Sequence, residues 1–236
     1  MRNNKKLAFI SSYLPEGFSV HPMAGDASFR KYDRINFGDR SYVLMDSPPE
    51  HYSTVPFERV AEFLSKNGFS APEIFYKDSE QGFLLLEDFG DVLIQHKLEE
   101  NRKKIYKLAI DLLVKLHQTS YPEWLEEYTN DVLLKEIRIF TDYYIPLFCG
   151  FELSEQALEE YLDLWVDVLE NRMPHLGMTT VLRDYHVQNM MHLDDREGIN
   201  SIGVLDFQDA VIGSPVYDLV SLLEDAREDV SFDFAK

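Results

Sequence analysis

The hydrophobic spacing changes once along this 236-residue chain, and that change limits the folds that the chain can adopt. Up to about residue 87, short apolar runs alternate with turn residues, which is typical of β-strands. A Gly38-Asp39 step between two such runs is a hairpin signal. Beyond residue 87, apolar residues recur with a period of 3.6, which is typical of amphipathic helices. The pattern predicts an α+β fold, with strands in front and helices behind.

The same spacing gives approximate positions for the elements. We expect strands over residues 19–22, 29–37, 41–45, 73–76 and 82–86. We expect helices over residues 57–67, 105–116, 132–140, 158–169 and 216–230. The apolar stripes of these helices are expected to lie in the core. The acidic turn at 87–91 is interpreted as a connector, so residues 1–87 and 88–236 are predicted to form two lobes.

Composition excludes several classes of protein. Hydrophobic residues make up 45% of the chain, which is enough to bury a core and excludes global disorder. The net charge of −19 would repel nucleic acids and anionic membranes, so neither is expected as a partner. The apolar run at residues 7–10 is too short for a signal peptide or a membrane span. Cys149 is the only cysteine, so no intrachain disulfide is expected, and we predict a cytoplasmic protein.

A polar segment at residues 181–191 does not have the pattern of a packed element. It contains Asp184 and, with four residues between them, Asn189; a later apolar run then ends in Asp206. Phosphoryl transfer from ATP needs an acid that orients and deprotonates the attacking hydroxyl, and it needs oxygen ligands for Mg²⁺. The order Asp184, Asn189, Asp206 matches that scheme, as in the catalytic loop and metal site of protein kinases.

Each part of this pattern is unspecific by itself, because the Asp–Asn spacing is common in loops and an acid at a strand end is usually a cap. Their combination, in this order and after a helical region, indicates function. His186 lies nearby in the sequence with His175 and His192, but their spacing fits no familiar zinc-ligand pattern. We therefore expect no zinc site and expect His186 to brace the loop through a hydrogen bond.

Three stretches of the chain resemble the aminoglycoside phosphotransferase superfamily of kinase-like enzymes. They are residues 182–189 (LRDYHVQN), 203–210 (GVLDFQDA) and 217–223 (YDLVSLL). More narrowly, they are similar to the bacterial branch with the cell-wall amino-sugar kinases, which phosphorylate N-acetylmuramate and N-acetylglucosamine at the anomeric hydroxyl. Further stretches agree with that branch: residues 25–32, 45–49 and 82–90. The resemblance runs from about residue 18 to 230.

The resemblance implies a bilobal, protein-kinase-like fold with a small antiparallel-sheet lobe and a helical lobe. It implies an ATP- and Mg²⁺-dependent phosphotransferase that acts on a hydroxyl of a small molecule, most simply an amino sugar. Asp184 would be the catalytic base, and Asn189 and Asp206 would hold Mg²⁺. Asp218 would be a structural acid that braces the catalytic loop. Substrate contacts, or contacts just behind them, are assigned to Arg183, His186, Gln208 and Asp209.

By the same resemblance, ATP would lie between the lobes. Backbone N–H groups of a loop of small residues would cover the phosphates, and the connector backbone would bind adenine. The nucleotide-binding residues expected on this basis are Gly25, Asp26, Ala27, Ser28, Arg30, Glu87 and Phe89.

Two features depart from the kinase pattern. Kinases have a phosphate-binding lysine on the third strand, and the corresponding position here holds Met45. The usual partner of that lysine is a glutamate on the next helix, here Glu58 or Glu62, and without the lysine we expect this side chain to be solvated. Relatives of the branch continue for several helices beyond the equivalent of residue 230, so terminal helices are expected to be missing. The helix at 216–230 would then expose apolar side chains, and two copies of the chain could associate through that face.

Two alternative functions stay open at this point. One is a truncated or degenerate relative that binds nucleotide without turnover. The other is a kinase of the same fold that acts on an aminoglycoside or an amino alcohol, for which the negative charge of the chain would suit a cationic acceptor.

Overall fold

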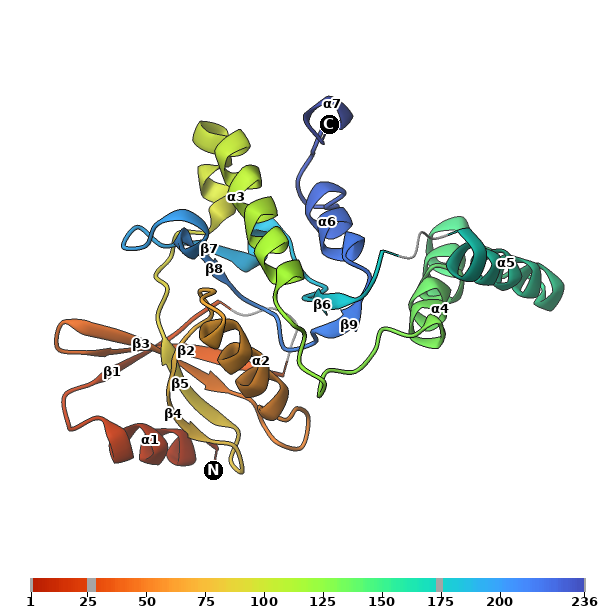
Figure 1. Ribbon diagram of the computed structural model, residues 1–236. Coiled ribbons are helices and arrows are strands. Elements are labelled where there is room, and N and C mark those ends of the chain that lie inside the picture. Colours follow the sequence, from red (N-terminus) through yellow and green to blue (C-terminus); the bar gives the residue numbers. More distant parts are fainter. Residues whose placement is uncertain (1, 25–28, 173–175, 236) are drawn as a thin grey trace.

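The computed structural model describes residues 2–24, 29–172 and 176–235 (Figure 1). The strands are β1 (Ser19–Pro22), β2 (Lys31–Phe37), β3 (Arg40–Asp46), β4 (Ile74–Asp78), β5 (Phe83–Glu87), β6 (Thr179–Val181), β7 (Met190–His192), β8 (Ile202–Val204) and β9 (Val211–Gly213). The α-helices are α1 (Arg2–Tyr13), α2 (Val55–Lys66), α3 (Leu98–Gln118), α4 (Asn130–Ile139), α5 (Glu155–Asp167), α6 (Val216–Leu223) and α7 (Phe232–Ala235). The predicted α+β class is confirmed.

The first five strands form one antiparallel sheet in the order β1-β2-β3-β5-β4. The hairpin between β2 and β3 closes at the predicted Gly38-Asp39 step, where Gly38 has a φ of +58°. Alternate residues of the strands face opposite sides of the sheet. In β5, Phe83 and Leu85 pack with α1, whereas Leu84 packs with α2. The predicted boundary at residue 87 coincides with the end of β5.

The α1 helix was not expected, because its sequence contains only one short apolar run. Two of its side chains, Phe9 and Ile10, are buried against the sheet. The helix is attached at its polar side by two ion pairs, Arg2 with Asp46 at 2.6 Å and Lys6 with Asp33 at 2.7 Å. Tertiary contacts of this kind stabilise a helix whose own amphipathic pattern is weak.

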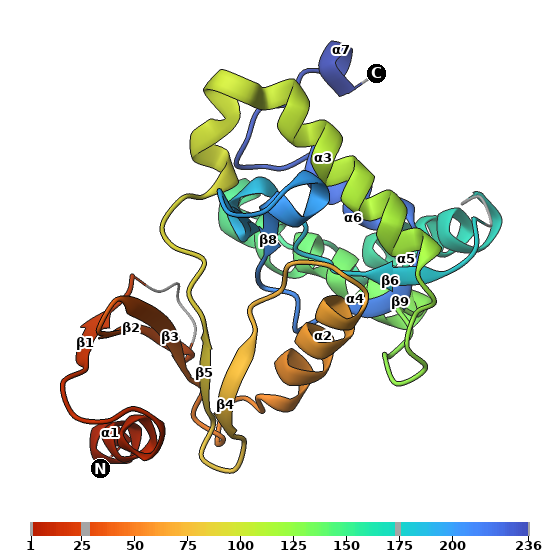
Figure 2. The same ribbon diagram turned by 60° about the vertical axis from the view of Figure 1, so that its left-hand side comes forward.

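The helical region is built on α3, whose predicted apolar stripe is buried. The two small antiparallel sheets, β6–β9 and β7–β8, lie against it and carry the polar segment found in the sequence. A backbone hydrogen bond of 2.7 Å joins His192 N to Val92 O, at the end of the connector, and one of 2.8 Å joins Val204 N to Ser70 O. The β7–β8 pair is therefore fixed to both the connector and the segment after α2 (Figure 2).

Two sequence-based expectations about the helices are wrong. The helix predicted over 216–230 ends at Leu223, since the chain turns at residues 224–227. The stripes at 132–140 and 158–169 were expected in the core, but α4 and α5, although described throughout, contain no buried residue. These two helices and the π-helical segment Phe140–Cys149 project from the rest of the molecule (Figure 1).

The apolar face predicted to be uncovered on the last long helix is only partly exposed. Leu222 is fully buried, Leu219 and Leu223 are partly buried against the core, and Val220 is 54% exposed. Larger exposed side chains lie instead on the projecting segment, where Tyr143 is 62% exposed and nearby residues are more so. No helix in the part of the chain that the structure describes has the length and apolar character needed to cross a membrane.

The turn before β5 should be the most sensitive glycine position in the sheet. Gly82 has a φ of +74°, and an added Cβ would lie 1.8 Å from Ser47 O, whereas a Cβ on Gly38 would meet nothing within 4 Å. We expect Gly38→Ala to lower the free energy of unfolding by about 1–2 kcal/mol through backbone strain alone. Gly82→Ala should lower it clearly further, and urea denaturation measures both. Equal losses for the two variants would contradict this account of the turn.

Candidate functional site

A buried carboxylate shapes the loop that follows β6. Asp218 of α6 is 1% exposed, and its two oxygens accept hydrogen bonds from Leu182 N at 2.7 Å and Arg183 N at 2.9 Å. Ser221 Oγ, one turn later on the helix, donates to Arg183 O at 3.1 Å. These bonds hold Arg183 at a φ of +71°, a conformation that non-glycine residues rarely adopt. The next residue, Asp184, is thereby turned out of the core and is exposed.

The three residues that the sequence singled out for phosphoryl transfer lie together. The Asn189 side-chain nitrogen is 3.0 Å from Asp184 O and 3.5 Å from Asp206 Oδ2. Asp206 follows β8 and has a φ of +57°, and the preceding residue is tied to the loop by a 2.9 Å hydrogen bond from Leu205 N to Asn189 O. The chain therefore brings two carboxylates and one amide to one place from two separate loops.

The electrostatic setting of Asp184 suits a proton acceptor. Partial desolvation, and after it the charge of Asp206, raises the pKa of Asp184 above its usual value. The positive charge of Arg183 acts in the opposite direction but does not reverse the shift. A higher pKa makes the carboxylate a stronger base, provided that it stays ionised at the working pH.

The residues present fit a magnesium ion that is shared with phosphate groups. A carbonyl oxygen can only accept a hydrogen bond, so the Asn189 NH₂ group must face Asp184 O, and the amide oxygen is left for a cation. Within residues 2–24, 29–172 and 176–235 there is no cluster of three or more histidine, cysteine, aspartate or glutamate residues that could hold a metal ion. Mg²⁺ commonly uses one or two protein oxygens and takes the rest from phosphates and water.

Gln208 and Asp209 lie beside the proposed metal acid. Gln208 is 8% exposed, and its side-chain nitrogen donates to Asp206 Oδ1 at 2.8 Å and to Asp209 Oδ2 at 3.1 Å. The amide therefore holds two acids of like charge side by side. This contact assigns Gln208 a supporting position behind Asp206, while the Asp209 side chain is open to solvent.

The Arg183 side chain is engaged by residues outside its own loop. Its guanidinium donates to Glu136 Oε1 of α4 at 2.5 Å and lies over the Tyr128 ring at 5.3 Å. The Tyr128 hydroxyl in turn donates to Glu136 and is 3.2 Å from the Tyr217 hydroxyl. Arg183 is therefore paired with an acid, and the pairing links the projecting helices to the loop that follows β6.

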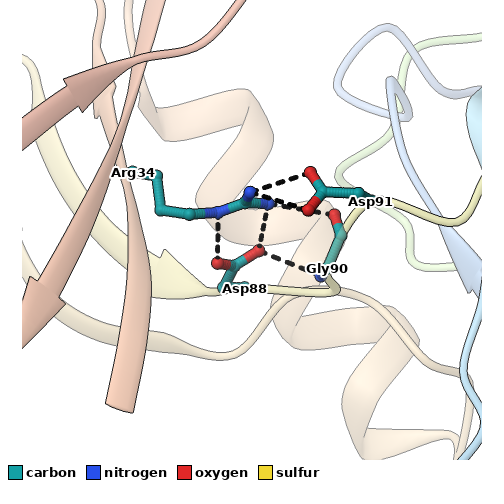
Figure 3. A network of polar contacts seen from close by, with 4 residues as sticks. All are labelled: Arg34, Asp88, Gly90 and Asp91. Carbon is teal, nitrogen blue, oxygen red and sulfur yellow. Dashed lines mark hydrogen bonds and ion pairs between the residues drawn. The ribbon is translucent and has the colours of Figure 1, made fainter. Parts of the chain in front are cut away.

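A network missed by the sequence analysis fixes the connector to the sheet (Figure 3). Arg34 of β2 donates to both oxygens of Asp88, at 2.6 and 3.0 Å, to both oxygens of Asp91, at 2.8 and 2.9 Å, and to Gly90 O at 3.1 Å. Burial by itself would raise the pKa of Asp88, but hydrogen bonds from Arg34 and Gly90 N outweigh it and lower that pKa. The acidic turn that forms the connector is thus held to the sheet by one arginine.

Two residues expected around the nucleotide, Glu87 and Phe89, flank Asp88 of this network in the sequence. Glu87 ends β5 and forms an ion pair with Arg196, whose guanidinium is 5.4 Å from the Phe89 ring. Phe89 packs so closely on Gly203 that a Cβ there would lie 2.7 Å from the ring. Arg30 precedes β2 and lies over the Tyr52 ring at 5.0 Å. Gly25, Asp26, Ala27 and Ser28 lie outside the described residues.

The position of the kinase lysine is apolar, as the sequence indicated. Met45 of β3 is fully buried, between Tyr32 of β2 and Leu84 of β5. Glu58 of α2 was expected to be solvated, and this is wrong: it is 5% exposed, and its carboxylate accepts from Lys77 Nζ of β4 at 2.9 Å. The ion pair between helix and sheet is therefore present, but its lysine lies on a different strand.

Comparisons with known proteins show which family the chain is similar to. A model described as "Phosphotransferase enzyme family" matches residues 19–236. The chain is 35% identical over 230 residues to the N-acetylmuramate/N-acetylglucosamine kinase of Pseudomonas aeruginosa, covering 92% of this chain and 66% of that protein. It is 31% identical over 271 residues to the kinase of the same name from Caulobacter vibrioides, covering 98% of this chain and 73% of that protein.

Among solved structures, the streptomycin–ATP complex of APH(2″)-IIa matches with a TM-score of 0.67 at 18% identity, covering 98% of this chain and 78% of that chain. That likeness bears on the fold, which is the bilobal, protein-kinase-like fold expected from the sequence. The chain spans about two thirds of the length of the two curated kinases it matches.

The Asp218 carboxylate should stabilise the folded chain by holding the loop that follows β6. Asp218→Asn replaces one acceptor oxygen with an NH₂ group that faces a backbone N–H. We expect this to lower the free energy of unfolding by about 1–3 kcal/mol, the typical effect of a buried group left without its partner. Urea denaturation provides the measurement, with Asp195→Asn, at an exposed loop position, as the matched control. A loss no larger than that of the control would contradict the role of Asp218.

The stability provided by Asp218 should also depend on pH. Burial raises its pKa from the usual 3.8 to about 7, although its two backbone hydrogen bonds act to lower it. Because the folded-state pKa is the higher one, the stabilising contribution is complete below about pH 4 and is lost as the pH rises to about 7. We expect the unfolding free energy of the wild type, relative to Asp218→Asn, to fall across that range. A difference that stays constant between about pH 5 and pH 8 would rule this out.

Proposed function

The chain belongs to the phosphotransferase enzyme family, and we propose that it is an ATP- and Mg²⁺-dependent kinase whose acceptor is a hydroxyl of an amino sugar. The observation that carries the proposal is the Asn189 amide, which joins the two acids: it contacts Asp184 O at 3.0 Å and Asp206 Oδ2 at 3.5 Å. A proton acceptor and two metal ligands are thereby held in one arrangement, as phosphoryl transfer needs.

In this proposal Asp184 accepts the proton of the acceptor hydroxyl as that oxygen bonds to the γ-phosphorus of ATP. The bond between the γ-phosphorus and the β–γ bridging oxygen breaks, and its electron pair leaves with ADP. Asn189 and Asp206 would hold Mg²⁺, which when bound neutralises charge on the phosphates. Gln208 keeps the Asp206 carboxylate in place, and the Arg183 guanidinium is held by Glu136.

The nucleotide would lie between residues 1–87 and 88–236, which we propose as the two lobes. Support comes from the Arg34 network, which fixes the connector, and from the packing of Phe89 on Gly203 beneath it. The adenine would meet the backbone near Glu87 and Phe89, and Arg30 would lie on the phosphate side.

The proposed acceptor rests on the named relatives. Two proteins that share at least 31% of their residues with this chain are called N-acetylmuramate/N-acetylglucosamine kinases. A small sugar of that kind carries the free hydroxyl that the mechanism needs and no net positive charge. The single cysteine, Cys149, is unpaired, which supports a place in the reducing cytoplasm.

Substituting Asp206 and substituting Asp184 should have different effects on ATP binding and turnover. We expect Asp206→Ala to abolish the increase in ATP affinity that Mg²⁺ provides, because the carboxylate bound to the metal is gone. Asp184→Ala should bind ATP and Mg²⁺ almost as the wild type does, while its turnover falls by about 10²–10⁴-fold, the usual effect of losing a general base. Calorimetric ATP titrations and a turnover assay test both, and an equal loss of affinity in the two variants would reject these roles.

The acceptor itself is tested by incubating the protein with ATP, Mg²⁺ and single candidates. We expect mass spectrometry to detect a phosphorylated product with N-acetylmuramate or N-acetylglucosamine. A product formed only from an aminoglycoside or an amino alcohol would replace the proposed acceptor class. Nucleotide binding with no product from any candidate would favour a degenerate relative, and the proposed function would fail.

A further inference from the structure

The Asn189 amide contacts a histidine as well as the two acids. Its side-chain nitrogen is 3.3 Å from His186 Nε2. The NH₂ group is already oriented by Asp184 O, and an amide NH₂ can only donate. Nε2 must therefore accept, because two donors facing each other would repel and turn the amide away. The geometry requires a neutral His186 ring that carries its proton on Nδ1.

The Nδ1 proton of this tautomer needs an acceptor, and one buried carboxylate oxygen in the described part of the chain lacks a donor. The His186 ring is 6% exposed, and Nδ1 is buried with no hydrogen-bond partner among the described residues. Asp225, in the turn after α6, has a side chain that is 1% exposed. Its Oδ1 accepts from Arg227 N at 3.0 Å, whereas Oδ2 is buried and has no partner in the described part of the chain. One donor and one acceptor are thus left over behind the catalytic loop.

A third unsatisfied group lies on α3. The Tyr106 ring is 2% exposed, and its hydroxyl is buried without a hydrogen-bond partner within the described residues. The charge of Asp225 acts on both Tyr106 and His186, so the carboxylate lies within electrostatic reach of both rings. Buried polar groups are normally satisfied, and an interior water usually has two to four polar partners. These three groups provide such a set.

We propose that Asp225, through a buried water also bound by Tyr106, holds His186 in its Nδ1–H tautomer, and that this tautomer positions the Asn189 amide for the metal. Asp225 and His186 are positioning residues, because both are buried and act through the Asn189 amide rather than by touching a reacting atom. The final step rests on the proposed function, in which Asn189 binds Mg²⁺. The tautomer itself does not depend on that function.

The tautomer is measured directly on the wild-type chain. Two-bond ¹H–¹⁵N correlation spectra of protein labelled at histidine distinguish the Nδ1–H from the Nε2–H form, and the spectrum of His186→Gln assigns the resonance among the seven histidines. We expect His186 as the Nδ1–H tautomer at neutral pH. A ring that is mainly Nε2–H would overturn the proposal, whether or not the chain is a kinase.

Asp225→Asn tests the coupling to the metal. An asparagine keeps the acceptor for Arg227 N and places an NH₂ donor where Oδ2 was, so it should favour the Nε2–H tautomer. We expect Mn²⁺ to bind about 10-fold to 100-fold more weakly in the presence of ADP, as for other residues behind a metal ligand. Free Mn²⁺ is followed by electron paramagnetic resonance, and Asp229→Asn, in the same segment and exposed, is the control.

Two outcomes would separate the parts of the inference. A shifted tautomer with unchanged Mn²⁺ affinity would overturn the link to Asn189. A wild-type chain that binds Mn²⁺ and ADP but phosphorylates no acceptor would refute the proposed function alone. His186→Leu should lose Mn²⁺ affinity and His186→Gln should recover part of it, because the glutamine oxygen can accept from Asn189. Equal loss in both variants, with unchanged thermal midpoints, would also overturn the proposal.

Discussion

The candidate site depends on the carboxylate of Asp218. Burying the ionisable Asp218 side chain costs free energy. Two backbone N–H groups, which would otherwise be unpaired at the start of the turn, offset part of that cost by donating hydrogen bonds to the carboxylate. The same bonds hold Arg183 in its left-handed conformation, so that Asp184 faces solvent while the next side chain, Tyr185, enters the core and donates to Ala109 O at 2.8 Å. Asn189 is then anchored on Asp184 O. This contact thus sets the direction of Asp184 and, through the Asp184 carbonyl, the position of Asn189.

The sequence predicted the parts of this arrangement that follow from neighbouring residues. The hairpin at Gly38, the buried stripe of α3 and the trio of Asp184, Asn189 and Asp206 all have local patterns. The Arg34 network was missed because it joins residues 54 and 57 positions apart, and only the strand register shows that Arg34 faces the connector. The sequence did contain a signal for this network, because Arg34 lies on a predicted strand and the turn at 87–91 is acidic.

The projecting helices show why periodicity alone does not predict burial. A stripe with a period of 3.6 shows that one helix face is apolar, but it does not show what covers that face. Leu147 and Phe148 are 74% and 76% exposed, and the accessible surface of the chain is 14,419 Å². A compact protein of 27.6 kDa is expected to expose about 11,000 Å². The excess surface is consistent with apolar helix faces that the rest of the described chain does not cover, and self-association stays a proposal.

The distribution of cations bears on the metal site proposed for this chain. Met45 and Lys77 are both paired with Leu84, so they lie in one row on the same face of the sheet, two strands apart. The lysine that pairs with the α2 glutamate has thus moved to the edge strand, and its charge is held by Glu58. Arg34 is likewise held by Asp88 and Asp91. Under the proposed function, with these cations engaged and an apolar side chain at the usual lysine position, neutralisation of the nucleotide phosphates would fall to the metal held by Asn189 and Asp206, together with Arg30.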